Sequence, residues 1–150
     1  MVLNEQQAIW DRLYKSGLAV RYPWSLVVST FMNRLLFGDL RGKKVLEYGC
    51  GDAVNLAFFA DLRMRSFGFD FSEASIARGA ENLTGRGYNV KITSKTTFDE
   101  STEEGSITLG VCDFQSFRTP TKFDYILDRG ALACANFEDI PNLIDYINDI

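Results

Sequence analysis

A short apolar run that leads into two closely spaced glycines constrains the fold of this chain more than any other feature. Residues 44–48 are predicted to form a strand, Gly49 and Gly51 follow it, and residues 53–62 have the pattern of a helix. Glycine accepts backbone conformations that other residues avoid, so such a loop can turn sharply and bring its backbone against a ligand. A strand, a glycine loop and a helix in this order predict the first half of a βαβ unit.

Strands and helices continue to alternate after this unit. Further strands are predicted at residues 66–70, 107–112 and 123–127. Ser72 can cap a helix that runs to about residue 83, and a last helix is predicted over residues 138–149. The alternation predicts an α/β fold in which helices flank a parallel sheet and the crossovers are right-handed.

The length of the chain predicts a single domain over residues 1–150. Residues 1–42 are predicted to be an N-terminal helical extension, and residues 43–150 the α/β core. Residues 89–106 are interpreted as an insertion before the third strand. Two alternatives are open for them: a solvated loop, or an extra strand over residues 89–97 that belongs to a hairpin.

The extension has two stretches with helical spacing, residues 4–16 and a stretch after Pro23 that carries apolar residues as far as Leu36. It also holds a group of aromatic residues: Trp10, Tyr14, Tyr22 and Trp24. Core packing is the favoured interpretation of these rings. A lid over a binding site is the alternative.

Composition excludes several kinds of chemistry. The chain has no histidine, so Ser-His-Asp triads, Cys-His pairs and histidine metal ligands are excluded, and no metal site is expected. The three cysteines are far apart and form no CxxC pair, which favours a reducing, cytoplasmic compartment. A net charge of −4 gives no basic footprint for nucleic acid, and no apolar run has the length of a membrane span.

The glycine loop is compatible with two ligand classes, dinucleotides and S-adenosylmethionine. The dinucleotide pattern needs Gly or Ala at position 54, where this chain has Val54. Glu47 lies directly before the loop, where its carboxylate would repel a pyrophosphate but would suit a ligand with an ammonium and a sulfonium group. The residues therefore favour S-adenosylmethionine. No Gly-Lys-Ser/Thr follows the loop, so a P-loop is excluded.

With these residues the chain resembles the class I S-adenosylmethionine-dependent methyltransferases, which have a Rossmann-like fold. Four motifs carry the resemblance over residues 43 to about 135, although Ala53 replaces the usual third glycine of the first motif. The resemblance implies that the following residues bind S-adenosylmethionine: Glu47, Gly49, Cys50 and Gly51 in the first motif, Asp70 and Phe71 in the second, Asp113 and Phe114 in the third, and Asp128 in the fourth. In the family, the acidic residue of the second motif holds the ribose hydroxyls, and the third motif lies at the adenine.

The resemblance implies transfer of a methyl group to a small-molecule acceptor of metabolite or sugar type. The fourth motif lacks the Pro-Pro-aromatic pattern of enzymes that methylate the amino groups of bases. No catalytic residue is identified. Asp128 is either a base or a residue that only shapes the strand end, and Arg129 either binds an anionic substrate or pairs with an acidic neighbour. Cys50 is interpreted as a small buried filler.

The family's sheet usually has seven strands, and this sequence predicts about four, so the last strands of the family fold are expected to be missing. The strand at residues 123–127 would then lie at an edge, where it could pair with a second copy of the chain to form a homo-oligomer. A non-catalytic module or fragment that binds S-adenosylmethionine or S-adenosylhomocysteine is therefore kept as the alternative function.

Overall fold

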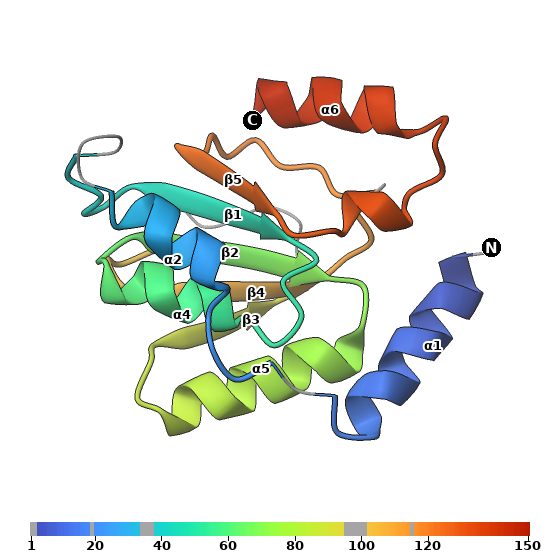
Figure 1. Ribbon diagram of the computed structural model, residues 1–150, viewed down its shortest axis with the longest axis horizontal. Coiled ribbons are helices and arrows are strands. Elements are labelled where there is room, and N and C mark those ends of the chain that lie inside the picture. Colours follow the sequence, from blue (N-terminus) through green and yellow to red (C-terminus); the bar gives the residue numbers. More distant parts are fainter. Residues whose placement is uncertain (1–2, 19, 34–37, 95–101, 115) are drawn as a thin grey trace.

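Five parallel strands form one sheet at the centre of the molecule, seen in a computed structural model (Figure 1). The structure describes residues 3–18, 20–33, 38–94, 102–114 and 116–150. The strands are β1 (Lys44–Tyr48), β2 (Arg65–Asp70), β3 (Val90–Thr93), β4 (Ile107–Val111) and β5 (Tyr125–Asp128). Their spatial order is β3-β4-β2-β1-β5, so the chain moves outward from β1 on one side and returns to its other side with β5. This reversal places a topological switch point beside β1, where open α/β sheets bind ligands at the carboxyl ends of their strands.

Helices surround this sheet, and their order follows the alternation of the sequence. They are α1 (Leu3–Lys15), α2 (Ser25–Phe31), α4 (Val54–Asp61), α5 (Glu73–Gly85), the short 3-10 helix η1 (Leu132–Cys134) and α6 (Ile140–Asp149). In Figure 1, α6 lies nearest to β5, and α1 stands at the end of the sheet toward which the strand arrows point.

Alternate residues of the central strands enter two different cores, because successive side chains of a strand point to opposite faces. Val45 packs with the apolar residues of α4 and α5 on one face. Leu46 and Tyr48 pack on the other face, with Phe67 and with Leu143 of α6. The central strands are therefore covered on both faces, as expected for a parallel sheet. Glu47 shares the face of Val45 and so lies among the residues of the first core.

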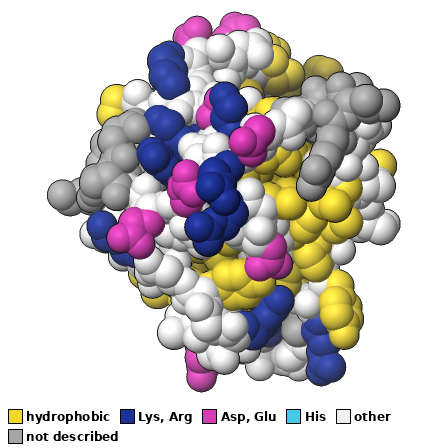
Figure 2. Space-filling model, turned by 90° about the vertical axis from the view of Figure 1, so that its left-hand side faces the viewer, with side chains coloured by type: hydrophobic (Ala, Val, Ile, Leu, Met, Phe, Trp, Pro, Cys, Tyr) yellow, Lys and Arg dark blue, Asp and Glu magenta, His cyan; other side chains and the backbone are white. Residues whose placement is uncertain are grey.

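Charged side chains of both signs are mixed on the face that Figure 2 shows, which is the left-hand side of Figure 1. Lys43, directly before β1, pairs with Asp124 at 2.9 Å, and Arg41 and Arg63 lie within 4.0 Å of Glu104. Opposite charges therefore neutralise one another at the amino ends of the strands.

The strands predicted from the sequence are all found, and the parallel α/β fold is confirmed. Two predictions need correction. Residues 90–93 are not part of a hairpin, because β3 pairs in parallel with β4 and forms a fifth strand at the sheet edge. The second helix ends at Phe31, and Leu36 lies outside the described residues. The strand predicted at residues 123–127 does lie at the opposite edge, as β5, but it begins at Tyr125 and ends at Asp128.

Gly68, in the middle of β2, is needed for packing. A Cβ atom there would lie 2.5 Å from Cδ1 of Leu56 and 2.9 Å from Cβ of Cys50. Overpacking of this kind costs roughly 1–3 kcal/mol, so Gly68→Ala should lower the free energy of urea unfolding by about this amount. Gly85→Ala is the matched control, because a Cβ at Gly85 meets nothing within 4 Å. Equal stabilities of the two variants would contradict the packing argument.

Candidate functional site

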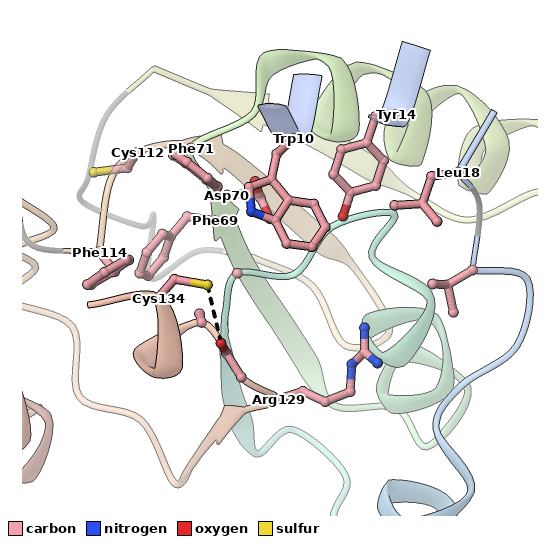
Figure 3. Close-up of a pocket in the computed structure, with 14 residues that line it drawn as sticks. Trp10, Tyr14, Leu18, Phe69, Asp70, Phe71, Cys112, Phe114, Arg129 and Cys134 are labelled. Carbon is pink, nitrogen blue, oxygen red and sulfur yellow. Dashed lines mark hydrogen bonds between the residues drawn. The ribbon is translucent and has the colours of Figure 1, made fainter. Parts of the chain in front are cut away.

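A cavity of about 270 Å³ lies at the carboxyl ends of the strands (Figure 3). Residues from the glycine loop, from the ends of β2, β4 and β5 and from the N-terminal segment line it: Trp10, Tyr14, Leu18, Val20, Gly49, Phe69, Asp70, Phe71, Cys112, Phe114, Arg129, Gly130, Ala131 and Cys134. Figure 3 shows Trp10 and Tyr14 on one side and Arg129 on another, with Phe114 and Cys112 toward the third. The lining is mainly apolar, with few polar groups, as is usual for small-molecule sites.

The glycines of the loop are required by neighbouring protein atoms. Gly49 and Gly51 have φ of 59° and 54°, in the left-handed region that favours glycine. A Cβ at Gly49 would lie 2.6 Å from Cβ of Ala131, and one at Gly51 would lie 2.6 Å from the hydroxyl oxygen of Tyr14. Ala53 is also left-handed, with φ 59°, which costs an ordinary residue roughly 1–2 kcal/mol. The loop is thus tightly fitted between α1 and the turn after β5.

Asp70 holds the glycine loop against the end of β2. Its carboxylate accepts the N–H of Gly51 at 3.0 Å and the N–H of Ser72 at 2.9 Å. The Ser72 hydroxyl in turn accepts the N–H of Ser75 and caps α5, as the sequence predicted. Burial raises the pKa of Asp70 above its ordinary value, and the hydrogen bonds from Ser72 and Gly51 oppose that shift. The Ser75 side chain is a third hydrogen-bond partner of this carboxylate. A carboxylate has about four acceptor positions, so Asp70 can accept one more bond from a ligand in the cavity.

Glu47 is buried beneath the loop, with 1% of its surface exposed. The Nδ2 of Asn55 donates to Oε1 at 2.6 Å, while Oε2 has no partner among the described residues. Burial raises the pKa of Glu47 to about 8, although Asn55 and the nearby charge of Arg129 lower it. Glu47 is therefore mainly protonated at neutral pH in the protein alone. A cation brought next to it would favour the charged form.

Asp128 and Asp113 shape the chain beside the cavity. The carboxylate of Asp128 accepts the N–H groups of Gly130 and Leu132, each at 3.1 Å, and so holds the turn that leads into η1. The carbonyl of Asp113 accepts from Ser116 and Phe117. The buried ring of Phe114, the residue directly after Asp113, lines the cavity.

Cys50 lies in the first core, away from the cavity lining. Its N–H donates to the carbonyl of Phe69 at 3.1 Å, and burial raises the pKa of its thiol well above the ordinary value. A buried thiol of this kind is unreactive. This geometry matches the interpretation of Cys50 as a filler.

The fold brings four of the predicted site residues into the cavity wall: Gly49, Asp70, Phe71 and Phe114. Five others stand behind or beside the wall: Glu47, Cys50, Gly51, Asp113 and Asp128. The sequence did not assign Leu18, Val20, Cys112 or Cys134 to the site, because none belongs to a motif.

The aromatic residues of the N-terminal segment are placed differently from the favoured sequence interpretation. Trp10 and Tyr14 line the cavity, and Tyr22 and Trp24 are 79% and 44% exposed, so core packing is wrong for this group. The sequence signal for these residues was the helical spacing of Trp10 and Tyr14, which places both rings on one face of a helix. It could not say which face of the helix would meet a ligand cavity.

Neither a metal cluster nor a membrane-spanning helix is found in the described part of the chain. It contains no group of three or more cysteine or acidic residues placed to hold a metal ion. None of its helices is both long and apolar enough to cross a bilayer.

Comparison with known families gives one match that covers nearly the whole chain. The model of the thiopurine S-methyltransferase family matches residues 5–149. No curated protein sequence matches significantly.

Solved structures with the same fold have low sequence identity to this chain. Magnesium protoporphyrin IX methyltransferase (ChlM) from Synechocystis PCC 6803, with bound SAM, has a TM-score of 0.65 at 15% identity, over 98% of this chain and 65% of that chain. TehB from Haemophilus influenzae has a TM-score of 0.63 at 20% identity, over 93% of this chain and 40% of that chain. A SAM-dependent methyltransferase from Thiobacillus denitrificans, in complex with S-adenosyl-L-homocysteine, has a TM-score of 0.59 at 14% identity, over 89% and 48%. The chain thus spans less than two thirds of the length of these structures, which confirm the Rossmann-like methyltransferase fold.

The raised pKa of Glu47 predicts a specific pH dependence of stability. Between pH 4.5 and about 8 the folded chain holds a proton on Glu47 that the unfolded chain has lost. The free energy of unfolding should therefore fall as pH rises through this range, by up to about 1.4 kcal/mol per pH unit from this group. Glu47→Gln should flatten the slope measured by urea unfolding at pH 5, 6, 7 and 8.

Glu81→Gln, at an exposed position of α5, is the control and should keep the slope of the original chain. If Glu47→Gln keeps that slope as well, Glu47 does not carry the buried proton.

Proposed function

The chain belongs to the thiopurine S-methyltransferase family, and from this premise we propose that it transfers a methyl group from S-adenosylmethionine to a small-molecule acceptor. The cavity at the switch point carries the proposal, because the glycine loop and Asp70 form one wall of it. The acceptor is expected to be a metabolite, with a sugar intermediate as one candidate.

The residues around the cavity fit S-adenosylmethionine in charge and shape. Asp70 lines the cavity, where its carboxylate can accept a ribose hydroxyl, and Phe71 and Phe114 offer apolar surface to the adenine. Glu47 has a buried oxygen without a partner, which suits the positive methionine end, directly or through water. The neighbouring Asp113 is proposed to lie near the adenine amino group.

S-adenosylmethionine supplies an activated methyl group that moves by in-line displacement, so the protein's task is mainly alignment. Orientation of two reactants can remove roughly 7–11 kcal/mol of a barrier. The chain needs no histidine for this task. Asp128 was a candidate base, but both its oxygens accept backbone N–H groups, which favours its role in shaping the strand end.

Arg129 points to an acceptor with negative charge. It lines the cavity, its side chain is exposed, and no ion pair of Arg129 is found among the described residues. The family's name denotes transfer to sulfur on thiopurines, so an aromatic thiol is the natural first probe for this chain. Pairing of the β5 edge with a second copy of the chain stays a prediction.

Binding of S-adenosylmethionine tests the proposal directly. By calorimetry at pH 7, S-adenosylmethionine should bind more tightly than NAD.

Glu47→Gln should weaken the binding of S-adenosylmethionine roughly tenfold or more, because a hydrogen bond to a charged group is worth about 1.5–3 kcal/mol. Uncharged adenosine should bind almost as before, and Glu81→Gln should bind both ligands like the original chain. Tighter binding of NAD would overturn the assignment. Equal losses for both ligands would mean that Glu47 only holds the loop.

The role of Arg129 is tested with a pair of thiol acceptors, 2-mercaptobenzoate and uncharged thiophenol. Arg129→Ala should raise KM for the carboxylated thiol roughly tenfold, which corresponds to about 1.4 kcal/mol, with kcat little changed. Arg129→Lys should keep part of the effect because the charge remains. An equal change of KM for both thiols would exclude charge recognition. Product formation also separates an enzyme from the alternative of a non-catalytic module, which would bind S-adenosylmethionine without turnover.

A further inference from the structure

A buried ion pair joins the glycine loop to helix α5 outside the cavity wall. The Nη2 of Arg78 lies 2.6 Å from Oδ1 of Asp52, and Nε of Arg78 donates to the same oxygen at 3.0 Å. The side chains of Arg78 and Asp52 are only 22% and 3% exposed. Gly79 lets α5 approach the loop, because a Cβ at this position would lie 3.1 Å from the backbone of Asp52.

Each partner of this ion pair also holds the N-terminal segment. The second oxygen of Asp52 accepts the N–H of Val20 at 2.9 Å. The Nη1 of Arg78 donates to the carbonyl of Tyr14 at 2.7 Å, and its guanidinium lies 4.9 Å from the centre of the Tyr14 ring. Asp52 and Arg78, together with these contacts to Tyr14 and Val20, form what we call the clasp.

The two backbone groups that the clasp holds belong to residues of the cavity wall. Tyr14 and Leu18 line the cavity (Figure 3), and Val20 does so as well. The Tyr14 hydroxyl occupies the space that a side chain at Gly51 would need. Any shift of this segment therefore changes the wall of the cavity at the glycine loop.

Apolar burial does little to hold α1 in place. Ile9 and Leu13 are 45% and 41% exposed, so one side of the helix gains little from the core. Two polar contacts also hold α1: Gln7 donates to the carbonyl of Phe71, and the Ser72 hydroxyl donates to Asp11. A helix held mainly by polar contacts opens more easily than one packed into a core. Within the clasp, the Asp52 side chain is only 3% exposed. Removing Arg78 would leave the charge of Asp52 uncompensated inside the protein.

We propose that Asp52 and Arg78 are positioning residues, which seat the end of α1 and the segment after it against the glycine loop and thereby set the affinity of the cavity for S-adenosylmethionine. The proposal rests on the proposed function, because it concerns the same cavity. Neither residue touches the cavity, so both act through Tyr14 and Val20. The ligand probe is S-adenosylmethionine itself.

Trypsin cleavage in the absence of ligand measures how firmly the end of α1 and the segment after it are held against the glycine loop. Lys15 and Arg21 are exposed and lie on either side of the held region, so cleavage after them measures its local opening. Arg78→Ala should be cleaved there at least about fivefold faster than the original chain, since cleavage follows the population of the open form. Arg63→Ala is the matched control, because it removes an exposed arginine within 4.0 Å of Glu104 at the other end of the sheet.

Calorimetry with S-adenosylmethionine supplies the second readout. If the seated fraction falls to about a tenth in Arg78→Ala, the apparent Kd rises about tenfold. Arg78→Lys keeps the charge but cannot reach both Asp52 and the Tyr14 carbonyl with one ammonium group, so it should lie between Arg78→Ala and the original chain. Arg63→Ala should bind like the original chain. Urea unfolding shows whether each variant is folded. If Arg78→Ala is not folded, the cleavage and binding measurements are made on Arg78→Lys instead.

The outcomes separate this proposal from the proposed function. Faster cleavage together with weaker binding supports the clasp as a positioning device. Unchanged cleavage overturns it, and so does faster cleavage with unchanged affinity, because seating would then not matter to the cavity. If the original chain does not bind S-adenosylmethionine at all, the proposed function fails. The clasp then fails as a determinant of that affinity, and the cleavage rates decide only whether it seats the segment.

Discussion

The carboxylate of Asp70 is the contact on which the site depends. It stands at the end of β2 and accepts the N–H groups of Gly51 and Ser72. One oxygen fixes the glycine loop that follows β1, and the other fixes the start of α5, which Ser72 then caps. Two neighbouring βα connections are thereby tied to one buried carboxyl group. The cavity lies directly beside this junction, so its shape follows from the same hydrogen bonds that hold the sheet ends together.

A second buried acidic residue, Glu47, lies below the glycine loop, and it has fewer hydrogen-bond donors around it than Asp70 has. Asp70 has two N–H donors that offset its burial, whereas Glu47 has one donor, Asn55, and an oxygen without a partner among the described residues. Burial therefore leaves Glu47 with a pKa of about 8, close to neutral pH. A group so placed can respond to a charged ligand by changing its protonation, while Asp70 serves to hold backbone. Two carboxylates beside the glycine loop, Glu47 in β1 and Asp70 in β2, thus have different roles because their hydrogen bonds differ.

The sequence predicted those parts of the fold that depend on local patterns. The strands around Leu46, Phe67 and Leu109, the left-handed glycines and the Ser72 cap follow from composition and spacing over a few residues. The wall formed by Trp10 and Tyr14 did not follow, because an amphipathic helix buries its aromatic face equally well in a core or over a cavity. The parallel pairing of Val90–Thr93 with β4 was missed for a similar reason, since a short strand carries no signal for the direction of its partner.

The clasp of Asp52 and Arg78 shows why a site of this kind extends beyond its lining. Methyl transfer by in-line displacement depends on alignment, and alignment depends on how firmly every wall of the cavity is held. Three walls are anchored in the sheet through β2, β4 and β5, but the fourth consists of Trp10, Tyr14, Leu18 and Val20, whose segment has little core of its own. Such a wall needs polar anchors, and Asn55 illustrates how they converge on the loop. Its amide oxygen accepts the N–H of Trp24 while its amide nitrogen donates to Glu47. Hydrogen bonds through Asn55 therefore link Trp24 to the carboxyl group of Glu47 below the glycine loop. A change of charge at Glu47 would alter the strength of the bond from Asn55, the residue to which Trp24 is attached.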